Sequence, residues 1–152
     1  MLEVQVLHPD DWQLWRRLRL EALAEAPATF GATLADWSGA GDTEPRWRAR
    51  LTSVPFNAIV HWNGTPAGMV GAFLPDDERA ELVSLWVAPS ARGQGVGDAA
   101  VGAVLHWAHA RDVGLSVKAD NQAAIRLYRR HGFQDCAAPD ETGEHRMLRP
   151  KS

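Results

Sequence analysis

The stretch from Arg92 to Gly97 combines residue types that favour binding of a phosphate group. It reads Arg-Gly-Gln-Gly-Val-Gly, so a glycine stands at every second position after the arginine. Glycines leave backbone N–H groups uncovered, and the helical pattern that follows adds a partial positive charge at its first turn. The arginine adds a planar cation that matches phosphate oxygens. The stretch therefore predicts a cradle for a phosphorylated cofactor.

Three kinds of phosphate loop share such glycines and differ in the surrounding residues. A Walker-type loop continues with lysine and a hydroxyl residue, whereas an aspartate follows Gly97 here. A dinucleotide fingerprint matches Gly95, Gly97 and Ala100, with Asp120 downstream. Its first glycine should directly follow a strand, however, and residues 88–94 intervene. A pyrophosphate loop of the form Arg/Gln-x-x-Gly-x-Gly/Ala fits the arginine and the last two glycines, and we prefer this interpretation.

A second block of residues lies one helix and one strand further along the chain. It runs from Asn121 to Phe133 and reads Asn-x-x-Ala-x-x-Leu-Tyr-x-x-x-Gly-Phe. With the glycine loop and the apolar stretch from Ala80 to Pro89, this block resembles the GCN5-related N-acetyltransferase (GNAT) superfamily. The two blocks stand in the family's order on the expected elements. One departure is the short stretch 112–114, which indicates that the fifth strand starts early or is short.

The resemblance implies acetyl-CoA (CoA) as the acetyl donor and a primary amine, in a small molecule or a peptide, as the acceptor. The glycine loop would bind the diphosphate, and the main chain of the fourth strand would bind the pantetheine arm and polarise the thioester carbonyl. Asn121 would both cap a helix and contact the pantetheine region. The residues that the resemblance assigns to cofactor binding are Leu85, Trp86, Val87, Arg92, Gly93, Gln94, Gly95, Val96, Gly97, Asn121, Ala124 and Tyr128.

Two side chains, Glu81 and Tyr128, are the candidates for catalytic proton transfer. An amine with a pKa of about 10.4 is mostly protonated at neutral pH, so some group must accept a proton. Glu81 stands in an apolar strand and matches a glutamate that acts as base in some relatives; its alternative is a strand-end glutamate that faces solvent. Tyr128, the sole tyrosine, matches the family's tyrosine and would protonate the leaving thiolate of CoA. Its alternative role is core packing, because Ala124, Leu127 and His131 share its helical face.

Strands and helices must alternate to bring these residues together. The patterns predict an α/β (α+β) fold, a GNAT-like mixed and mostly antiparallel twisted sheet flanked by helices, in the order β-α-α-β-β-β-α-β-α-β-β. Asn63-Gly64 marks a hairpin turn. We expect strands over 2–6, 56–62, 68–74, 80–87, 115–118, 133–137 and 144–148. We expect one helix capped by Asp10 or Asp11 and ended by Pro27, a second from Thr43 onward, a third over 97–111 and a fourth capped by Asp120 or Asn121 that runs through His131.

The composition fits one domain over residues 1–152 and excludes several functions. A net charge of −3 gives no basic field for nucleic acid, and no apolar run is long enough to cross a membrane. Cys136 is the only cysteine, so an intrachain disulfide is excluded and a cytoplasmic location is favoured. We interpret Cys136 as a structural thiol. His106 and His109 lack the spacing of a zinc site, so we expect no metal.

Two rival classes and several details stay open at this point. A non-catalytic acyl-CoA-binding or sensor module would keep the glycine loop, and a dinucleotide-binding protein would bind NAD(H). The acceptor is not fixed; we expect acceptor loops at 29–46 and 137–143. The tryptophans at 12, 15 and 47 either line an acceptor pocket or pack in the core. The closing strand can pair with a second copy, so a homodimer is one option.

Overall fold

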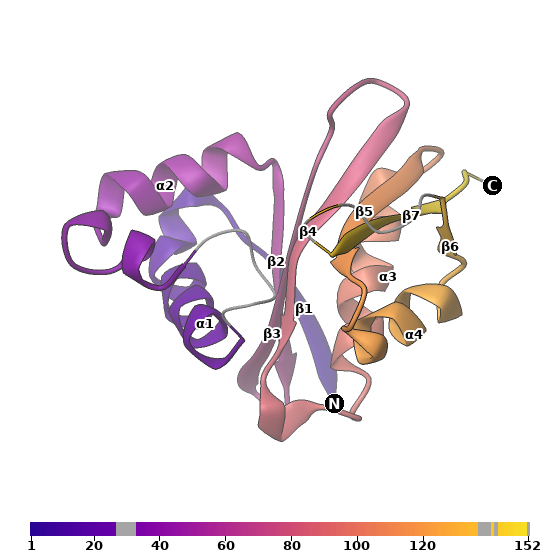
Figure 1. Ribbon diagram of the computed structural model, residues 1–152. Helices are drawn as coiled ribbons and strands as arrows, with labels where there is room; N and C mark the ends of the chain where they lie inside the picture. The colour runs from indigo at the N-terminus through magenta and orange to yellow at the C-terminus, as the bar shows by residue number, and fades with distance from the viewer. Residues whose placement is uncertain (27–32, 137–140, 142, 152) are drawn as a thin grey trace.

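A single sheet organises the computed structural model, which describes residues 1–26, 33–136, 141 and 143–151 (Figure 1). Within these residues the sheet has seven strands in the order β1-β2-β3-β4-β5-β7-β6, and all neighbours are antiparallel except β4 and β5. The predicted mixed sheet and the predicted element order are confirmed. The strands are β1 (Leu2–Val6), β2 (Phe56–Trp62), β3 (Thr65–Phe73), β4 (Arg79–Val87), β5 (Asp112–Lys118), β6 (Gln134–Asp135) and β7 (Glu144–Arg149). The α-helices are α1 (Trp12–Glu25), α2 (Glu44–Ser53), α3 (Val96–Ala108) and α4 (Gln122–Arg130).

Helices cover the sheet on both faces, as Figure 1 shows. Helices α1 and α2 pack on one face, where Trp15 and Trp47 are fully buried in a cluster with Ile59, so the core-packing interpretation of these two tryptophans is confirmed. Helices α3 and α4 pack on the other face, where Val101 lies in a second buried cluster. Because β2 is covered on both sides, its residues from Phe56 to Val60 form a continuous buried run.

The central feature of the sheet is the divergence of β4 and β5. These two strands pair only at their first residues, ending with Glu81 opposite Gly114. Beyond that point β4 stays paired with β3, while β5 pairs with β7. A bulge accompanies the divergence, because the register between β3 and β4 shifts and Ser84 has a φ of 59°. The two strands therefore open like a wedge toward their carboxyl ends.

The turn between α3 and β5 differs from the prediction. Helix α3 ends at Ala108 rather than at 111, and β5 begins at Asp112 rather than at 115. Ala110 has a φ of 64°, which no helix interior accommodates. Asp112 is fixed as a strand residue, because its N–H donates to the carbonyl of Glu78 at 3.2 Å. The short stretch 112–114 thus belongs to an early start of the fifth strand.

Hairpin geometry and the chain end account for the other differences. Strand β3 begins at Thr65 rather than at 68, because Asn63 and Gly64 both have positive φ and form a tight turn that pairs Trp62 with Thr65. Strand β6 covers only 134–135 of the predicted 133–137, whose last residue lies outside the described part of the chain. The predicted helix end at Pro27 also lies outside it.

The closing strand β7 lies between β5 and β6, so the basis of the homodimer option is wrong: the strand at 144–149 is internal to the sheet.

Candidate active site

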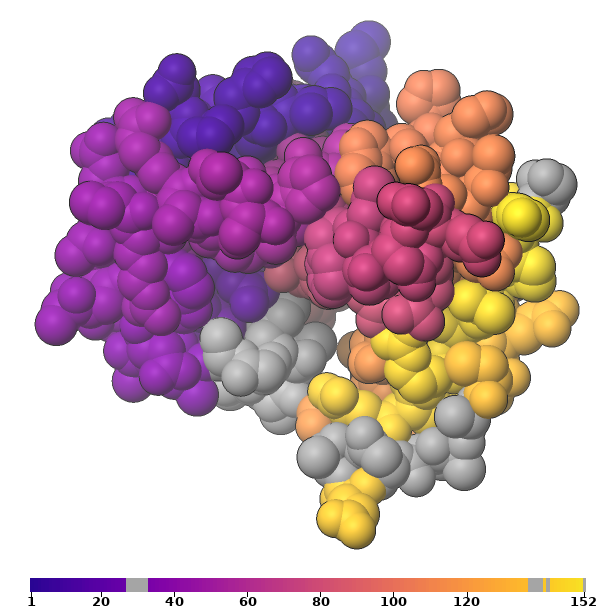
Figure 2. Space-filling view, turned by 90° about the horizontal axis from the view of Figure 1, so that it is seen from above, coloured from indigo at the N-terminus to yellow at the C-terminus, as the bar shows by residue number. Residues whose placement is uncertain are grey.

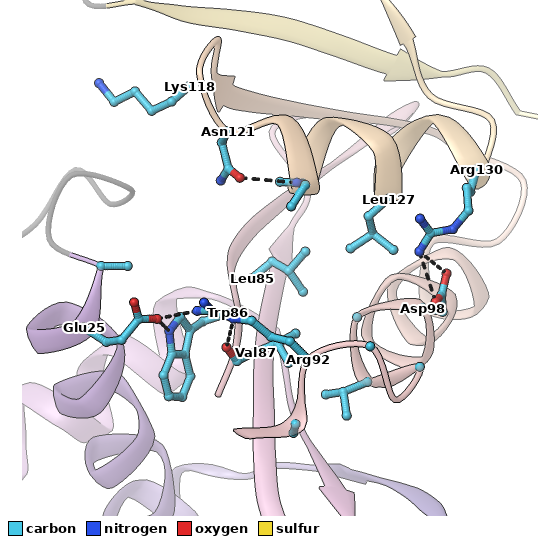
Figure 3. A pocket seen from close by; sticks show the side chains of 18 of the residues that line it. Glu25, Leu85, Trp86, Val87, Arg92, Asp98, Lys118, Asn121, Leu127 and Arg130 are labelled. Atoms are coloured by element: carbon cyan, nitrogen blue, oxygen red, sulfur yellow. Dashed lines mark hydrogen bonds and ion pairs between the residues drawn. The ribbon is translucent and has the colours of Figure 1, made fainter. Parts of the chain in front are cut away.

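A cavity of about 720 Å³ lies where β4 and β5 have diverged, between the glycine loop and the first turn of α4 (Figure 3). It brings together residues from three separate stretches of sequence: the end of α1, the run from the end of β4 through the loop to the start of α3, and the region from the end of β5 into α4. Among the predicted cofactor residues, it is lined by Leu85, Trp86, Val87, Arg92, Gly93, Gly95, Val96, Gly97, Asn121 and Ala124. Gln94 and Tyr128 do not line it.

The glycine loop has the backbone conformation that its sequence predicts. Gly93 and Gly95 have φ values of 80° and 84°, and Gly95 precedes the first residue of α3. Such values exclude most side chains, which explains glycine at both positions. Gly97 is required for another reason: a Cβ atom there would lie 2.9 Å from Cδ2 of Leu127 on α4. The loop therefore presents the N-terminus of α3 to the cavity while α3 and α4 stay closely packed.

The N–H groups of the loop glycines lack a backbone acceptor among the described residues. Within the described residues, no backbone carbonyl outside a helix or strand accepts a hydrogen bond from Gly93, Gly95 or Gly97. The first N–H groups of a helix have no intrahelical acceptor either, and Gly95 stands at the N-cap of α3. Together with the helix dipole, these donors make an anion site that opens into the cavity.

Arg92 is held at the cavity edge by two neighbours. Its Nε donates to the carbonyl oxygen of Val87 at 3.2 Å, and its guanidinium also forms an ion pair with Glu25 at the end of α1 (Figure 3). Glu25 in turn accepts a hydrogen bond from Nε1 of Trp86 at 3.1 Å. The sequence analysis missed Glu25, because nothing in a helical segment so far from the loop indicates that the two meet.

The cavity is also lined by charged side chains that the sequence did not assign to the site. Asp98 accepts hydrogen bonds from Arg130 at 3.1 Å and from His131 at 2.8 Å. Burial alone would raise the pKa of Asp98, but the hydrogen bonds from His131 and Arg130 outweigh burial and hold this pKa below its usual value. The lining residues that sequence analysis missed are Glu25, Ala26, Ala91, Asp98, Lys118, Asp120, Ala123, Leu127 and Arg130.

Asn121 serves as the predicted cap of α4. Its side-chain oxygen accepts a hydrogen bond from the N–H of Ala124 at 3.3 Å, and its side chain also lines the cavity. The capping role is therefore confirmed. Contact with the pantetheine arm stays a prediction, for which the position of Asn121 on the cavity wall is suitable.

Tyr128 lies in the core beneath the cavity wall. It is buried on α4, and its ring is tilted against Phe133 with 5.7 Å between the ring centroids. Burial raises the pKa of its hydroxyl well above the ordinary value of 10.0. The contacts of the ring agree with the core-packing interpretation. Proton donation to the thiolate stays a prediction.

Glu81 is the last residue of β4 that pairs with β5, and it does not line the cavity. Its carboxylate is gripped by the guanidinium of Arg146 on β7, with 2.9 Å between Nη2 and Oε1 and a second contact from Nη1 to Oε2. The side chain is only 14% exposed, so the solvent-facing alternative is wrong. A Cβ atom on Gly114 would lie 2.6 Å from Nη2 of Arg146, so a side chain there would displace the guanidinium. The role of Glu81 as base stays a prediction.

The remaining candidate groups show no second chemical centre. In the parts of the chain that the structure covers, no three His, Cys, Asp or Glu side chains gather closely enough to hold a metal. Cys136 is exposed beside β6. Across those same parts, every helix is too short or too polar to span a bilayer. The expected acceptor loops at 29–46 and 137–143 lie partly outside the described residues.

Comparison with known proteins places the chain in a family. A family model described as the acetyltransferase (GNAT) family matches residues 13–133. The chain therefore belongs to this family, and the resemblance found in the sequence is confirmed. An uncharacterized N-acetyltransferase from Methanocaldococcus jannaschii is 33% identical over 82 residues, a match that spans 48% of this chain and 36% of that protein.

Solved structures share the fold at low sequence identity. An acetyltransferase of the GNAT family from Streptococcus pneumoniae has a TM-score of 0.79 and 19% identity, with all of both chains covered. A phosphinothricin acetyltransferase of the same superfamily from Sinorhizobium meliloti, in complex with AcCoA, has a TM-score of 0.79 and 17% identity over 99% of this chain and 89% of that chain. At such identities the likeness concerns the fold.

Proposed function

We propose that the protein is an acetyl-CoA-dependent N-acetyltransferase that moves the acetyl group to a primary amine by direct attack in a ternary complex. The observation that carries this proposal is the cavity between the diverging strands β4 and β5, with the bare amides of Gly93 to Gly97 at one end. Membership of the GNAT family supports it. The complex of the Sinorhizobium meliloti protein with AcCoA supports the choice of cofactor.

The residues that line the cavity fit the parts of acetyl-CoA. The amides of Gly93 to Gly97 and the guanidinium of Arg92 would bind the diphosphate. The main chain of β4 from Leu85 to Val87 lies where β5 has diverged, so polar groups on this edge of β4, apart from the Val87 carbonyl that accepts from Arg92, can bind the amide-rich pantetheine arm as an added strand would. When bound there, acetyl-CoA supplies the activated acetyl group.

The backbone and two side chains would serve the reaction itself. An N–H of β4 near Leu85 would stabilise the developing negative charge on the carbonyl oxygen. Glu81 would accept the proton of the amine through water, because it does not line the cavity directly. Tyr128 does not line the cavity either; it keeps its proton at neutral pH, since burial raises its pKa, and would give that proton to the leaving thiolate through water.

A non-catalytic acyl-CoA-binding or sensor module is the second candidate. The observation that favours it is the ion pair with Arg146, which occupies both oxygens of Glu81 and leaves the proposed base with fewer free lone pairs. Incubation with acetyl-CoA and a panel of amines, with free thiol measured, separates the two. Thiol release that depends on an amine supports the transferase. Binding of acetyl-CoA without release on any amine supports the sensor.

We further propose a cytoplasmic location and a homodimer. A reducing compartment such as the cytoplasm fits the single cysteine of the chain. A homodimer would most easily form at β1, an edge strand whose side chains Leu2, Val4 and Val6 are each at least 39% exposed. Sedimentation at several protein concentrations tests this assembly, and a monomer throughout would exclude it.

A further inference from the structure

Strand β1 leaves one edge of the sheet open, because β2 is its only neighbour among the described strands. Directly after β1, the N–H of Leu7 donates to the carbonyl of Asn57 at 2.8 Å. In an antiparallel pair, positions that bond to the neighbouring strand alternate with positions whose N–H and C=O point away from it. Counting back from Leu7, the residues that point away are Leu2, Val4 and Val6, and we call them the edge residues.

The edge residues lack the features that usually keep the edge of a sheet unpaired. In the part of the chain that the structure describes, no backbone group of a loop or cap bonds to their N–H or C=O groups. Strand β1 contains no lysine and no proline, and its pairing with β2 shows no bulge. The side chains of Leu2, Val4 and Val6 are 39%, 40% and 52% exposed. A regular apolar edge of this kind is a template for pairing with another strand.

An apolar groove of about 490 Å³ adjoins the open edge, on the face of the sheet that α3 covers. Val4, Val6 and Phe56 line it from the sheet, and Ala99, Ala103 and Trp107 line it from α3. Figure 2 shows the indigo N-terminal region and the orange region that includes the end of α3 along one margin of the molecule. The groove and the edge residues thus form one continuous apolar surface.

The sequence of β1 is complementary to itself in an antiparallel pair. A two-fold axis through Val4 places Val4 opposite its own copy, Leu2 opposite Val6 and Glu3 opposite Gln5. Each edge residue then faces an edge residue of the second copy, so their N–H and C=O groups find partners. The apolar side chains form cross-strand pairs, and Glu3, the only charged residue of β1, faces a neutral side chain. The same surface on both copies is what a two-fold dimer requires.

We propose that two copies of the chain pair through β1 in this register and form one continuous sheet across the two-fold axis. The inference deepens the homodimer of the proposed function by naming its interface. Because the axis is perpendicular to the sheet, helix α3 of both copies lies on the same face, and the two grooves adjoin the axis. Leu2 of each copy then packs beside Val6 of the other, at the border of the groove.

Val4→Lys tests the position of the axis, because it places two lysines directly opposite each other. We expect this variant to raise the Kd of the dimer about tenfold or more. Leu74→Lys is the matched control, since Leu74 is 39% exposed and follows β3, which does not pair with β1. Sedimentation at several protein concentrations measures the Kd, and the melting temperature checks the fold. A wild-type protein that stays monomeric, or a Val4→Lys variant that dimerises as tightly as Leu74→Lys, overturns the inference.

A disulfide across the axis tests the register. In a Cys136→Ser background, Val4→Cys brings two thiols opposite each other, with Cα atoms about 5.5 Å apart, which a disulfide can span. Glu3→Cys is the matched control, because Glu3 is also exposed but faces position 5 of the second copy. We expect the oxidised dimer to form at least about tenfold faster with Val4→Cys. Equal or faster crosslinking by Glu3→Cys overturns the proposed register.

Thiol release from acetyl-CoA, measured on the same samples, separates this inference from the proposed acetyl transfer. Within the described residues, none from β1 lines the cofactor cavity, so we expect Val4→Lys to release thiol at the rate of the wild type. A monomeric wild-type protein with amine-dependent release overturns the interface and leaves the transferase standing. A dimer with the predicted response to Val4→Lys but no release on any amine supports the interface and contradicts the transferase.

Discussion

Arg146 on β7 reaches across β5 and binds both carboxylate oxygens of Glu81 on β4. The contact passes over Gly114, the last residue of β5 that pairs with β4, and Ser116 supports it by accepting from Arg146 at 3.1 Å. The ion pair therefore joins the two strands at the point where they begin to separate. It gives Glu81 a structural role beside the catalytic role that we propose for it, and the two roles can be told apart.

Glu81→Gln should lower kcat/KM about a hundredfold if Glu81 accepts the proton of the amine. The amide keeps the shape of the side chain but cannot take up a proton. Arg146→Met is the comparison, because it breaks the same contact and keeps the carboxylate. Equal losses of melting temperature in both variants, with activity of Glu81→Gln near that of the wild type, would restrict Glu81 to its structural role.

Tyr128→Phe should lower turnover with little change in acetyl-CoA affinity. The ring stays in the core beside Phe133, and only the hydroxyl that would protonate the thiolate is removed. A loss of about a hundredfold or more in kcat is expected for a general acid. The measurement is steady-state kinetics beside calorimetric binding of acetyl-CoA. Unchanged turnover would remove Tyr128 from the mechanism.

The alkaline titration of Tyr128 tests its burial independently of activity. Its pKa in the folded protein lies above the unfolded value near 10.0, so the folded state binds this proton more tightly. The resulting stability is fully present below about pH 10 and is lost as the pH rises toward the folded pKa. Because the chain has one tyrosine, tyrosinate absorbance reports on it alone. We expect ionisation only in step with unfolding; a midpoint at or below 10 in the folded protein would show an accessible hydroxyl.

The glycine that precedes α3 and a glycine in the middle of α3 should respond to substitution in opposite directions. Gly95 has a φ of 84°, so Gly95→Ala should destabilise the protein by about 1 kcal/mol, and Gly95→Trp should abolish cofactor binding. Gly102 lies inside the helix with open space at the position of a Cβ atom, so Gly102→Ala should stabilise by about 0.5–1 kcal/mol. Denaturant unfolding and binding of CoA measure both effects. Tight binding by Gly95→Trp would refute the role of the loop.

The negative charge of the native Glu25 side chain should weaken the binding of the cofactor. It pairs with Arg92 beside the amides that would bind the diphosphate, so it competes with that anion for the guanidinium. Glu25→Gln should therefore tighten CoA binding about two- to fivefold at low salt, and less at high salt. Glu21→Gln on the exposed side of α1 is the control. Weaker binding by Glu25→Gln would mean that the ion pair positions Arg92 for the cofactor.

The parts of this fold that sequence predicted are those with local signals. The glycine loop, the cap at Asn121 and the turn at Asn63-Gly64 each follow from the conformational preferences of the residues present. Hydrophobic periodicity located the strands and helices, because the core selects one face of each element. Element ends were less accurate, as at Asp112, since a hydrogen bond to the distant Glu78 fixes that strand end.

Contacts between distant segments could not be predicted in the same way. The ion pair of Arg92 with Glu25 joins residues from the loop and from α1, and no local pattern connects them. The bidentate contact between Glu81 and Arg146 likewise depends on the order of strands in the sheet. Arginine at position 50 has the pattern of a surface residue in an amphipathic helix, and only the packing of α2 shows that it is bound against Asn57.

The central claim is that the amides from Gly93 to Gly97 bind the diphosphate of CoA, and a crystal structure of the protein with CoA tests it most directly. The account predicts diphosphate oxygens within hydrogen-bonding distance of these amides, beside Arg92, with the pantetheine arm between β4 and β5. A diphosphate bound elsewhere, or no bound cofactor at saturating concentration, would contradict it.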